Sequence, residues 1–185
     1  MKHLVFLLEE ESAKEFLSNL LPRISKNATY RYIAFEGKTD LENNIEKKLR
    51  GYNVPNSYFI ILRDQDSGDC YEIKKELIQK CSNAFKPDAL IRIACTELES
   101  WFFGDLEGVE KALELNNLKK MKYSSKYRNP DIIVKPSYEL EKITKYRYQK
   151  VSGSREIGKY INIENNSSKS FQVFVDGIKN LLGDN

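Results

Sequence analysis

Four apolar segments, each followed by a stretch with helical periodicity, are the feature of this sequence that most limits its fold. The segments are residues 3–9, 29–36, 58–62 and 89–95. Strands that alternate with helices form a parallel sheet, and a continuous apolar run is typical of a strand covered on both faces. The sequence therefore predicts an α/β fold with a four-stranded, mainly parallel sheet flanked by helices.

The last third of the chain has a different pattern. From about residue 116 the strand-like runs stop, and short helical patterns appear at residues 137–146, 154–161 and 169–182. We expect residues 1–115 to form the α/β core. Residues 116–185 are predicted to be a basic, mostly helical extension that packs on this core.

Three predicted helices begin with a Ser or Thr followed three residues later by Glu. This capping-box pattern occurs at residues 12–15, 39–42 and 96–99. In a capping box the Glu accepts the N–H of the capping residue. The pattern gives Glu15, Glu42 and Glu99 a structural explanation.

The scarcity of histidine and cysteine excludes several reaction classes. The chain has one histidine, His3, so Ser-His-Asp and Cys-His catalysis are not expected. The three cysteines lack the paired spacing of a zinc site or a disulfide framework.

No apolar run approaches the ~20 residues of a membrane span. We therefore expect a cytoplasmic protein with no membrane partner.

The net charge of +3 conceals two regions of opposite sign. Residues 64–114 carry six Lys or Arg against twelve Asp or Glu, whereas residues 119–159 carry twelve against four. The second region also contains many tyrosines. Cations neutralise phosphates, and aromatic rings stack on unpaired bases. The extension is therefore a candidate nucleic-acid surface, although a solvated basic helical surface would show the same composition.

Carboxylates follow three of the predicted strands. In open α/β sheets, ligands bind beyond the carboxyl ends of the strands. Glu9 follows the first strand, with Glu10 next to it. The third strand is followed by Asp64, Asp66 and Asp69, and the fourth by Glu97 and Glu99. Mg²⁺ prefers such oxygen ligands. We therefore predict a Mg²⁺ site, which could also take Mn²⁺, formed by Glu9, Asp64 and Asp66.

Two more acids are candidates for this metal site. Asp69 and Glu97 could hold a second ion. Asp69 is also explained as the N-cap of a predicted helix at residues 70–81. Both interpretations of Asp69 remain open at this stage.

Six segments of the chain resemble the DUF4276 family, a Toprim-like family often encoded beside ATPases in bacterial defence loci. They are LLEEESAKEFL, FEGKTDL, ILRDQDSGDC, ELESWFFGD, YRNPD and NSSKSFQVFVDGI. The resemblance implies a Toprim or Rossmann-like fold, as in topoisomerases, primases and OLD-type nucleases. It also implies catalytic roles for Glu9, Asp64 and Asp66, with Glu97 or Glu99 as further acidic candidates. Toprim domains usually have Gly after the glutamate, so Glu10 leaves open which glutamate faces the metal.

The resemblance implies a Mg²⁺-dependent nuclease acting on DNA or RNA, with a partner ATPase, in defence against phages. The alternatives are a non-catalytic adaptor that binds the ATPase and another phosphoryl-transfer activity. Residues 150–155 are expected to be a flexible basic loop before a helix. The candidate phosphate-binding residues are Lys38, Arg63, Arg92, Lys126, Arg128, Lys150 and Arg155.

Overall fold

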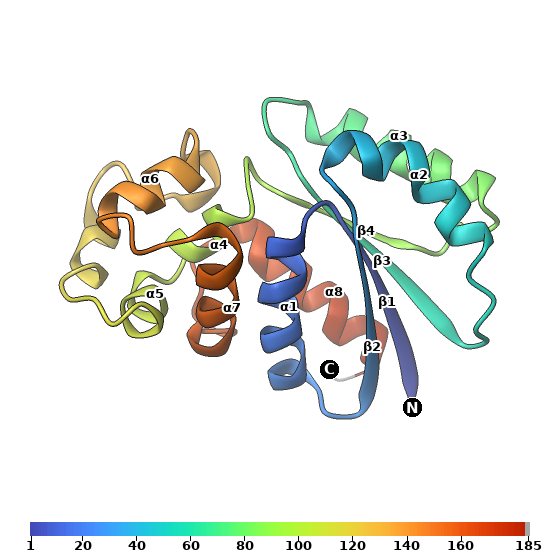
Figure 1. The fold of residues 1–185 in the computed structure, drawn as a ribbon, viewed down its shortest axis with the longest axis horizontal. Helices are drawn as coiled ribbons and strands as arrows, with labels where there is room; N and C mark the ends of the chain where they lie inside the picture. The colour runs from blue at the N-terminus through green and yellow to red at the C-terminus, as the bar shows by residue number, and fades with distance from the viewer. Residues whose placement is uncertain (184–185) are drawn as a thin grey trace.

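The protein contains one four-stranded, fully parallel sheet with the strand order β2-β1-β3-β4 (Figure 1). A computed structural model describes residues 1–183. The strands are β1 (Lys2–Leu8), β2 (Ala28–Ala34), β3 (Ser57–Asp64) and β4 (Leu90–Ala94). The α/β fold expected from the sequence is confirmed.

Helices cover both faces of the sheet. Figure 1 shows α2 and α3 on one face and α1 and α8 on the other, with α4 to α7 gathered beside the sheet. No helix within residues 1–183 is long and apolar enough to cross a membrane. The helices are α1 (Glu11–Ile24), α2 (Lys38–Arg50), α3 (Cys70–Asn83), α4 (Glu99–Phe103), α5 (Leu106–Ala112), α6 (Pro136–Ile143), α7 (Lys150–Tyr160) and α8 (Lys169–Leu182), with short 3₁₀ turns at Lys119–Tyr123 and Pro130–Ile132.

Strand β1 shows why the sheet needs two layers of helices. Successive side chains of a strand point to opposite faces. Leu4 and Phe6 belong to the apolar cluster on the α1 and α8 side, whereas Val5 and Leu7 belong to the cluster under α2 and α3. All four are buried. An apolar run without alternation is therefore stable only with cover on both sides.

The hydrophobic core continues from the sheet into the C-terminal third of the chain. The ring of Trp101 in α4 lies 5.4 Å from Phe171 and 5.0 Å from Phe174, both in α8. Phe102 lies 5.0 Å from Phe16 of α1. These aromatic residues are buried, and one apolar cluster includes residues from both parts of the sequence.

Helix α7 begins four residues earlier than the sequence pattern predicted. The segment 150–155, expected to be a loop, forms its first turns, and Gly153 N donates to Gln149 O at 2.6 Å. Helix α6 ends three residues early, at Ile143, because Lys145 and Tyr146 have positive φ angles. A left-handed backbone cannot continue a right-handed helix.

Candidate functional site

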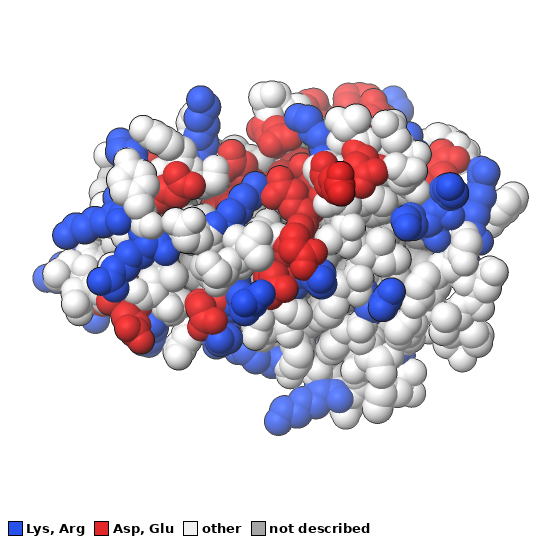
Figure 2. Space-filling model, viewed as in Figure 1, with Lys and Arg blue, Asp and Glu red and all other residues white. Residues whose placement is uncertain are grey.

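The structure brings Glu9, Asp64 and Asp66 together at the carboxyl ends of β1 and β3. Glu9 Oε2 accepts the backbone N–H of Asp64 at 3.1 Å. The negative charge of Asp66 is close enough to Glu9 to raise the pKa of the Glu9 carboxyl. In Figure 2, acidic side chains gather in the middle of the molecule, between the part that holds the sheet and the helical extension. The three predicted metal ligands are therefore neighbours.

Backbone hydrogen bonds fix the loop that carries Asp66. Gln65 N donates to Ala94 O at 2.9 Å, and Asp66 N donates to Thr96 O at 2.7 Å. Asp66 has a φ of 54°, a left-handed conformation in which Asp is over-represented. The loop is thus held against the end of β4.

Burial and mutual repulsion raise the pKa values of Glu9 and Asp64. Burial is the main cause of the raised pKa of Glu9; the Asp64 N–H opposes it, and the charge of Asp66 adds to it. The pKa of Asp64 is held well above its usual value by burial, then by Glu99 and Glu9. A bound cation would relieve this repulsion.

Glu99, for which the sequence offered both a capping role and a place among the strand-end acids, is a member of this cluster. It is fully buried, and its Oε1 accepts the hydroxyl of Tyr148 at 2.7 Å. Its Oε2 is buried without a hydrogen-bond partner among residues 1–183. Burial raises its pKa. Helix α4 begins at Glu99 itself, so the capping box at Thr96 was wrong. The only signal for this role was its position just after a strand.

Lys38 and Lys150 lie at the edges of the acidic cluster. Lys38 Nζ is 2.9 Å from Asp66 Oδ2, and Lys150 Nζ is 2.5 Å from Glu10 Oε2. Burial opposes charge on Lys150, but its hydrogen bond to Glu10 and the charges of Glu99, Glu10 and Asp64 raise its pKa overall. Glu10 is thus paired with a lysine, while Glu9 is the glutamate next to Asp64.

Arg63 forms a close ion pair with Glu42 and only a long contact with Glu9. Its Nη2 is 2.9 Å from Glu42 Oε1, while its Nε is 4.0 Å from Glu9 Oε2. That Nε is buried without a hydrogen-bond partner in residues 1–183. The firm ion pair of Arg63 is therefore with Glu42.

The two further metal candidates have structural partners. Asp69 Oδ1 accepts the N–H groups of Tyr71 and Glu72 at 2.8 and 3.1 Å, so its interpretation as the N-cap of α3 is confirmed. Glu97 Oε2 accepts the N–H of Ser137 in α6 at 2.8 Å. Glu97 thereby ties the core to the extension.

The donor chemistry of the cluster fits a hard divalent cation. Its donor atoms are all oxygen, the pKa values of Glu9 and Asp64 are raised, and Glu99 Oε2 has no hydrogen-bond partner within residues 1–183. Within the described range, however, no group of three or more Asp, Glu, His or Cys side chains stands ready to hold a metal ion. The carboxylates would have to rotate to share one ion.

The other predicted phosphate-binding residues are bound elsewhere or lie apart. Arg92 donates to the backbone oxygens of Ile91 and Val173, at 2.9 and 3.1 Å, and so lies between β4 and α8. Arg128 is exposed on the extension. Lys126 is paired with Glu139, and Arg155 with Glu15. The structure thus brings Lys38, Lys150 and Arg63 to the acids, but not Arg92.

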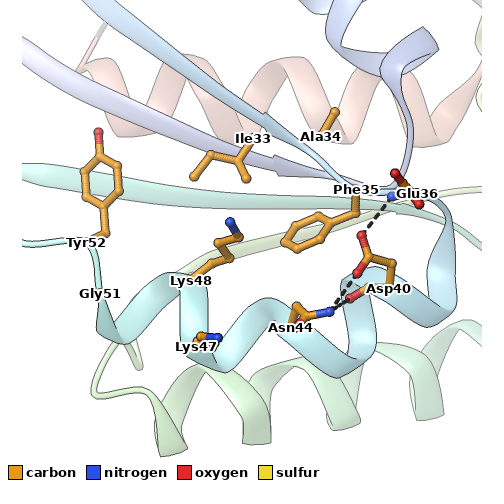
Figure 3. Close-up of a pocket in the computed structure, with 10 residues that line it drawn as sticks. All are labelled: Ile33, Ala34, Phe35, Glu36, Asp40, Asn44, Lys47, Lys48, Gly51 and Tyr52. Atoms are coloured by element: carbon orange, nitrogen blue, oxygen red, sulfur yellow. Dashed lines mark hydrogen bonds between the residues drawn. The ribbon is translucent and has the colours of Figure 1, made fainter.

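A hollow of about 710 Å³ between β2 and α2 lies outside the acidic cluster (Figure 3). Phe35, Asp40 and Lys48 are among its lining residues. Asp40 accepts the backbone N–H of Glu36 and the side-chain amide of Asn44. Both carboxylate oxygens of Asp40 are therefore engaged in holding the first turns of α2.

Comparisons with known proteins agree with this architecture. A family model described as "Domain of unknown function (DUF4276)" matches residues 8–179. No curated protein sequence matches the chain. Among solved structures, the C-terminal region of the Burkholderia pseudomallei OLD protein is similar, with a TM-score of 0.54 and 13% sequence identity. The match covers 97% of this chain and 98% of that one, and it shows a shared fold.

Proposed function

This chain belongs to the DUF4276 family, and from that premise we propose that it is a Mg²⁺-dependent, Toprim-like nuclease that cleaves phosphodiester bonds in DNA or RNA. The observation that carries the proposal is the grouping of Glu9, Asp64 and Asp66 at the carboxyl ends of two neighbouring parallel strands. The fold shared with the C-terminal region of an OLD protein supports it.

In this proposal Glu9, Asp64 and Asp66 hold Mg²⁺, or Mn²⁺ in its place. The bound ion would supply positive charge that orients the scissile phosphate and lowers the pKa of a water molecule. Lys38 and Lys150, now paired with carboxylates of the cluster, are the cations that could pair with a phosphate of the nucleic acid instead. Both are about half exposed, at 50% and 46% of their side-chain surfaces.

The basic extension is proposed to carry the rest of the nucleic acid. Lys126 and Arg128 lie there, and Tyr123 and Tyr146 expose 77% and 66% of their surfaces. Exposed rings beside cations fit stacking on unpaired bases. The affinity for nucleic acid should then fall steeply as salt concentration rises. An affinity that does not depend on salt would contradict this role.

The resemblance of the sequence to proteins encoded beside ATPases leads us to propose a partner ATPase and a role in anti-phage defence. A non-catalytic adaptor is the alternative. The absence of a ready group of three metal-binding side chains in residues 1–183, and the ion pairs of Asp66 and Glu10 with lysines, favour that alternative.

A nuclease assay distinguishes the two. Purified protein, alone and with the neighbouring ATPase, is incubated with labelled DNA or RNA and Mg²⁺ or Mn²⁺. We expect cleavage that Asp64→Asn reduces about 100-fold or more. Asp69→Asn is the matched control, because Asn is also a good N-cap, and it should retain cleavage.

Undiminished cleavage by the folded Asp64→Asn protein would exclude this site. If the chain binds the ATPase but cleaves nothing under any of these conditions, the adaptor is supported instead. Co-purification of the two proteins provides that second measurement.

A further inference from the structure

The outer edge of β4 is an open edge of the sheet. Gln65 N donates to Ala94 O, so the backbone groups of Ala94 face β3. The backbone N–H and C=O groups of adjacent residues point to opposite edges of a strand, so those of Ile91, Ile93 and Cys95 face outward. No strand pairs with this edge in the described sheet.

Side chains satisfy part of this edge and leave its middle open. The Ile91 carbonyl accepts from Arg92 Nη1 at 2.9 Å, and Cys95 N–H reaches Ser170 Oγ at 3.4 Å. Between them, the N–H and C=O of Ile93 have no hydrogen-bond partner within residues 1–183. The N–H of Ile91, one step further toward the start of β4, has none there either. Unpaired strand edges are templates for a further strand.

A groove runs along this edge between α3 and α8. It consists of two hollows of about 360 and 330 Å³, which share Lys74, Ile91 and Arg92. The first reaches Ser170 near the start of α8, and the second reaches Leu181 near its end. The groove thus follows the whole length of β4.

Exposed apolar side chains line both walls of this groove. Tyr71 and Ile78 of α3 expose 81% and 46% of their surfaces, and Val173 of α8 exposes 43%. Neither the core nor the acidic cluster accounts for them. Apolar side chains beside an open strand edge are the features that bind an extended peptide by strand addition.

The charges at the groove select an acidic occupant. Lys74 and Lys169 are exposed, one on each wall, and neither has an ion pair among the described residues. Of the acids, Asp131 is satisfied by Ser168 and Ser170. Asp88 lies in the second hollow, at the other end of β4. A second copy of the chain paired here would bring like lysines together, which is unfavourable.

We propose that the β4 edge binds an extended segment of a partner protein, with alternating apolar and acidic residues, as a fifth strand of the sheet. Main-chain bonds to Ile91 and Ile93 would give affinity, and Lys74 and Lys169 would select negative charge. This inference is independent of the nuclease proposal, because it requires no metal and no cleavage.

The test uses a labelled, acetylated seven-residue peptide of alternating Glu and Val, with binding measured by fluorescence anisotropy. Two further peptides carry N-methyl groups on every second amide, in the two possible phases. In only one of these two peptides do the methyl groups replace the amide hydrogens that face β4. We expect that peptide to bind at least tenfold more weakly, and the other methylated peptide to bind like the unmethylated one. Hydrogen exchange at the amides of Ile91 and Ile93 should slow when the unmethylated peptide binds.

Charge variants supply the matched control. Lys74→Glu with Lys169→Glu should weaken binding at least tenfold, whereas Lys47→Glu with Lys48→Glu on α2 makes the same charge change away from the groove and should not. Absent binding, equal loss with both methylation phases, or equal loss in both double variants would overturn the proposal. So would a dimer of the free chain that protects the Ile93 amide, since a second copy would then occupy the edge.

Discussion

The carboxylate of Glu9 accepts the backbone N–H of Asp64 at 3.1 Å. The acid that follows β1 is therefore held by the main chain at the end of β3, the neighbouring strand in the sheet. The parallel pairing of β1 with β3 brings the ends of the two strands together, and the Glu9 side chain then reaches the main chain of Asp64. The same strand pairing leaves Glu10 outside, paired with Lys150.

This arrangement predicts different roles for the adjacent glutamates. Glu9→Gln keeps an acceptor oxygen for the Asp64 N–H but removes the charge, and cleavage should fall about 100-fold. Glu10→Gln should keep most of the activity. Cleavage rates, with circular dichroism to verify folding, measure both effects. The reverse ranking would make Glu10 the metal-facing residue.

The ionised side chain of Asp64 should lower the free energy of unfolding when no metal is bound. Its pKa is raised well above the ordinary 3.8, so ionising it at neutral pH destabilises the folded state. Asp64→Asn should raise the free energy of unfolding at pH 7 in chelator-containing buffer. The gain should shrink as the pH falls through the raised pKa and vanish below 3.8, where both states are protonated. Urea titrations at several pH values measure it, and a loss of stability at pH 7 would contradict this prediction.

Mg²⁺ should stabilise the wild-type protein against heat. A ligand that binds only the folded state adds about 1.4 kcal/mol at ten times its Kd. For a chain of this size, that raises Tm by roughly 3–6 °C. Thermal scans with and without Mg²⁺ measure the shift. Asp64→Asn should abolish it and Asp69→Asn should not; the same shift in all three proteins would indicate binding elsewhere.

The Tyr148 hydroxyl is the side-chain donor to the buried Glu99. Tyr148→Phe removes it and leaves a buried carboxyl without that bond, so the free energy of unfolding should fall by about 1–3 kcal/mol. In a Glu99→Leu background the same change should cost much less, because no carboxyl remains to be satisfied. Denaturation of the four proteins in this double-mutant cycle gives the coupling. Equal costs in both backgrounds would show that the bond contributes little.

Gly158 allows α7 to approach α1 closely. A Cβ there would lie 2.5 Å from the Phe16 carbonyl oxygen, which cannot move without its helix. Gly158→Ala should therefore destabilise by about 1–3 kcal/mol, although Ala favours helix by roughly 1 kcal/mol. Gly51→Ala is the control, since its Cβ would meet nothing closer than 3.4 Å. Chemical denaturation compares them, and an unchanged Gly158→Ala protein would refute the close approach.

The strands and the meeting of Glu9 with Asp64 could be predicted from the sequence because both follow from local patterns. An apolar run reports a doubly covered strand, and parallel strands bring their carboxyl ends to one edge. The resemblance to DUF4276 is likewise confirmed by the family match over residues 8–179.

The starts of α1, α2 and α4 could not be predicted, because distant partners use the glutamates of the apparent capping boxes. Glu15 pairs with Arg155, Glu42 with Arg63, and Glu99 with Tyr148. The helices near the first two boxes begin at Glu11 and Lys38, ahead of Ser12 and Thr39. A local motif contains no information about such partners.

The packing of α7 on α1 also determines when this protein can finish folding. Arg155 and Glu15 are 140 positions apart, so α1 is synthesised long before the helix that packs on it. Until that helix is made, part of the apolar face of α1 stays exposed to solvent. Long-range contacts of this kind slow folding and prolong the exposure of hydrophobic surface that can aggregate. Nascent chains of this protein should therefore depend on chaperones until α7 has been synthesised.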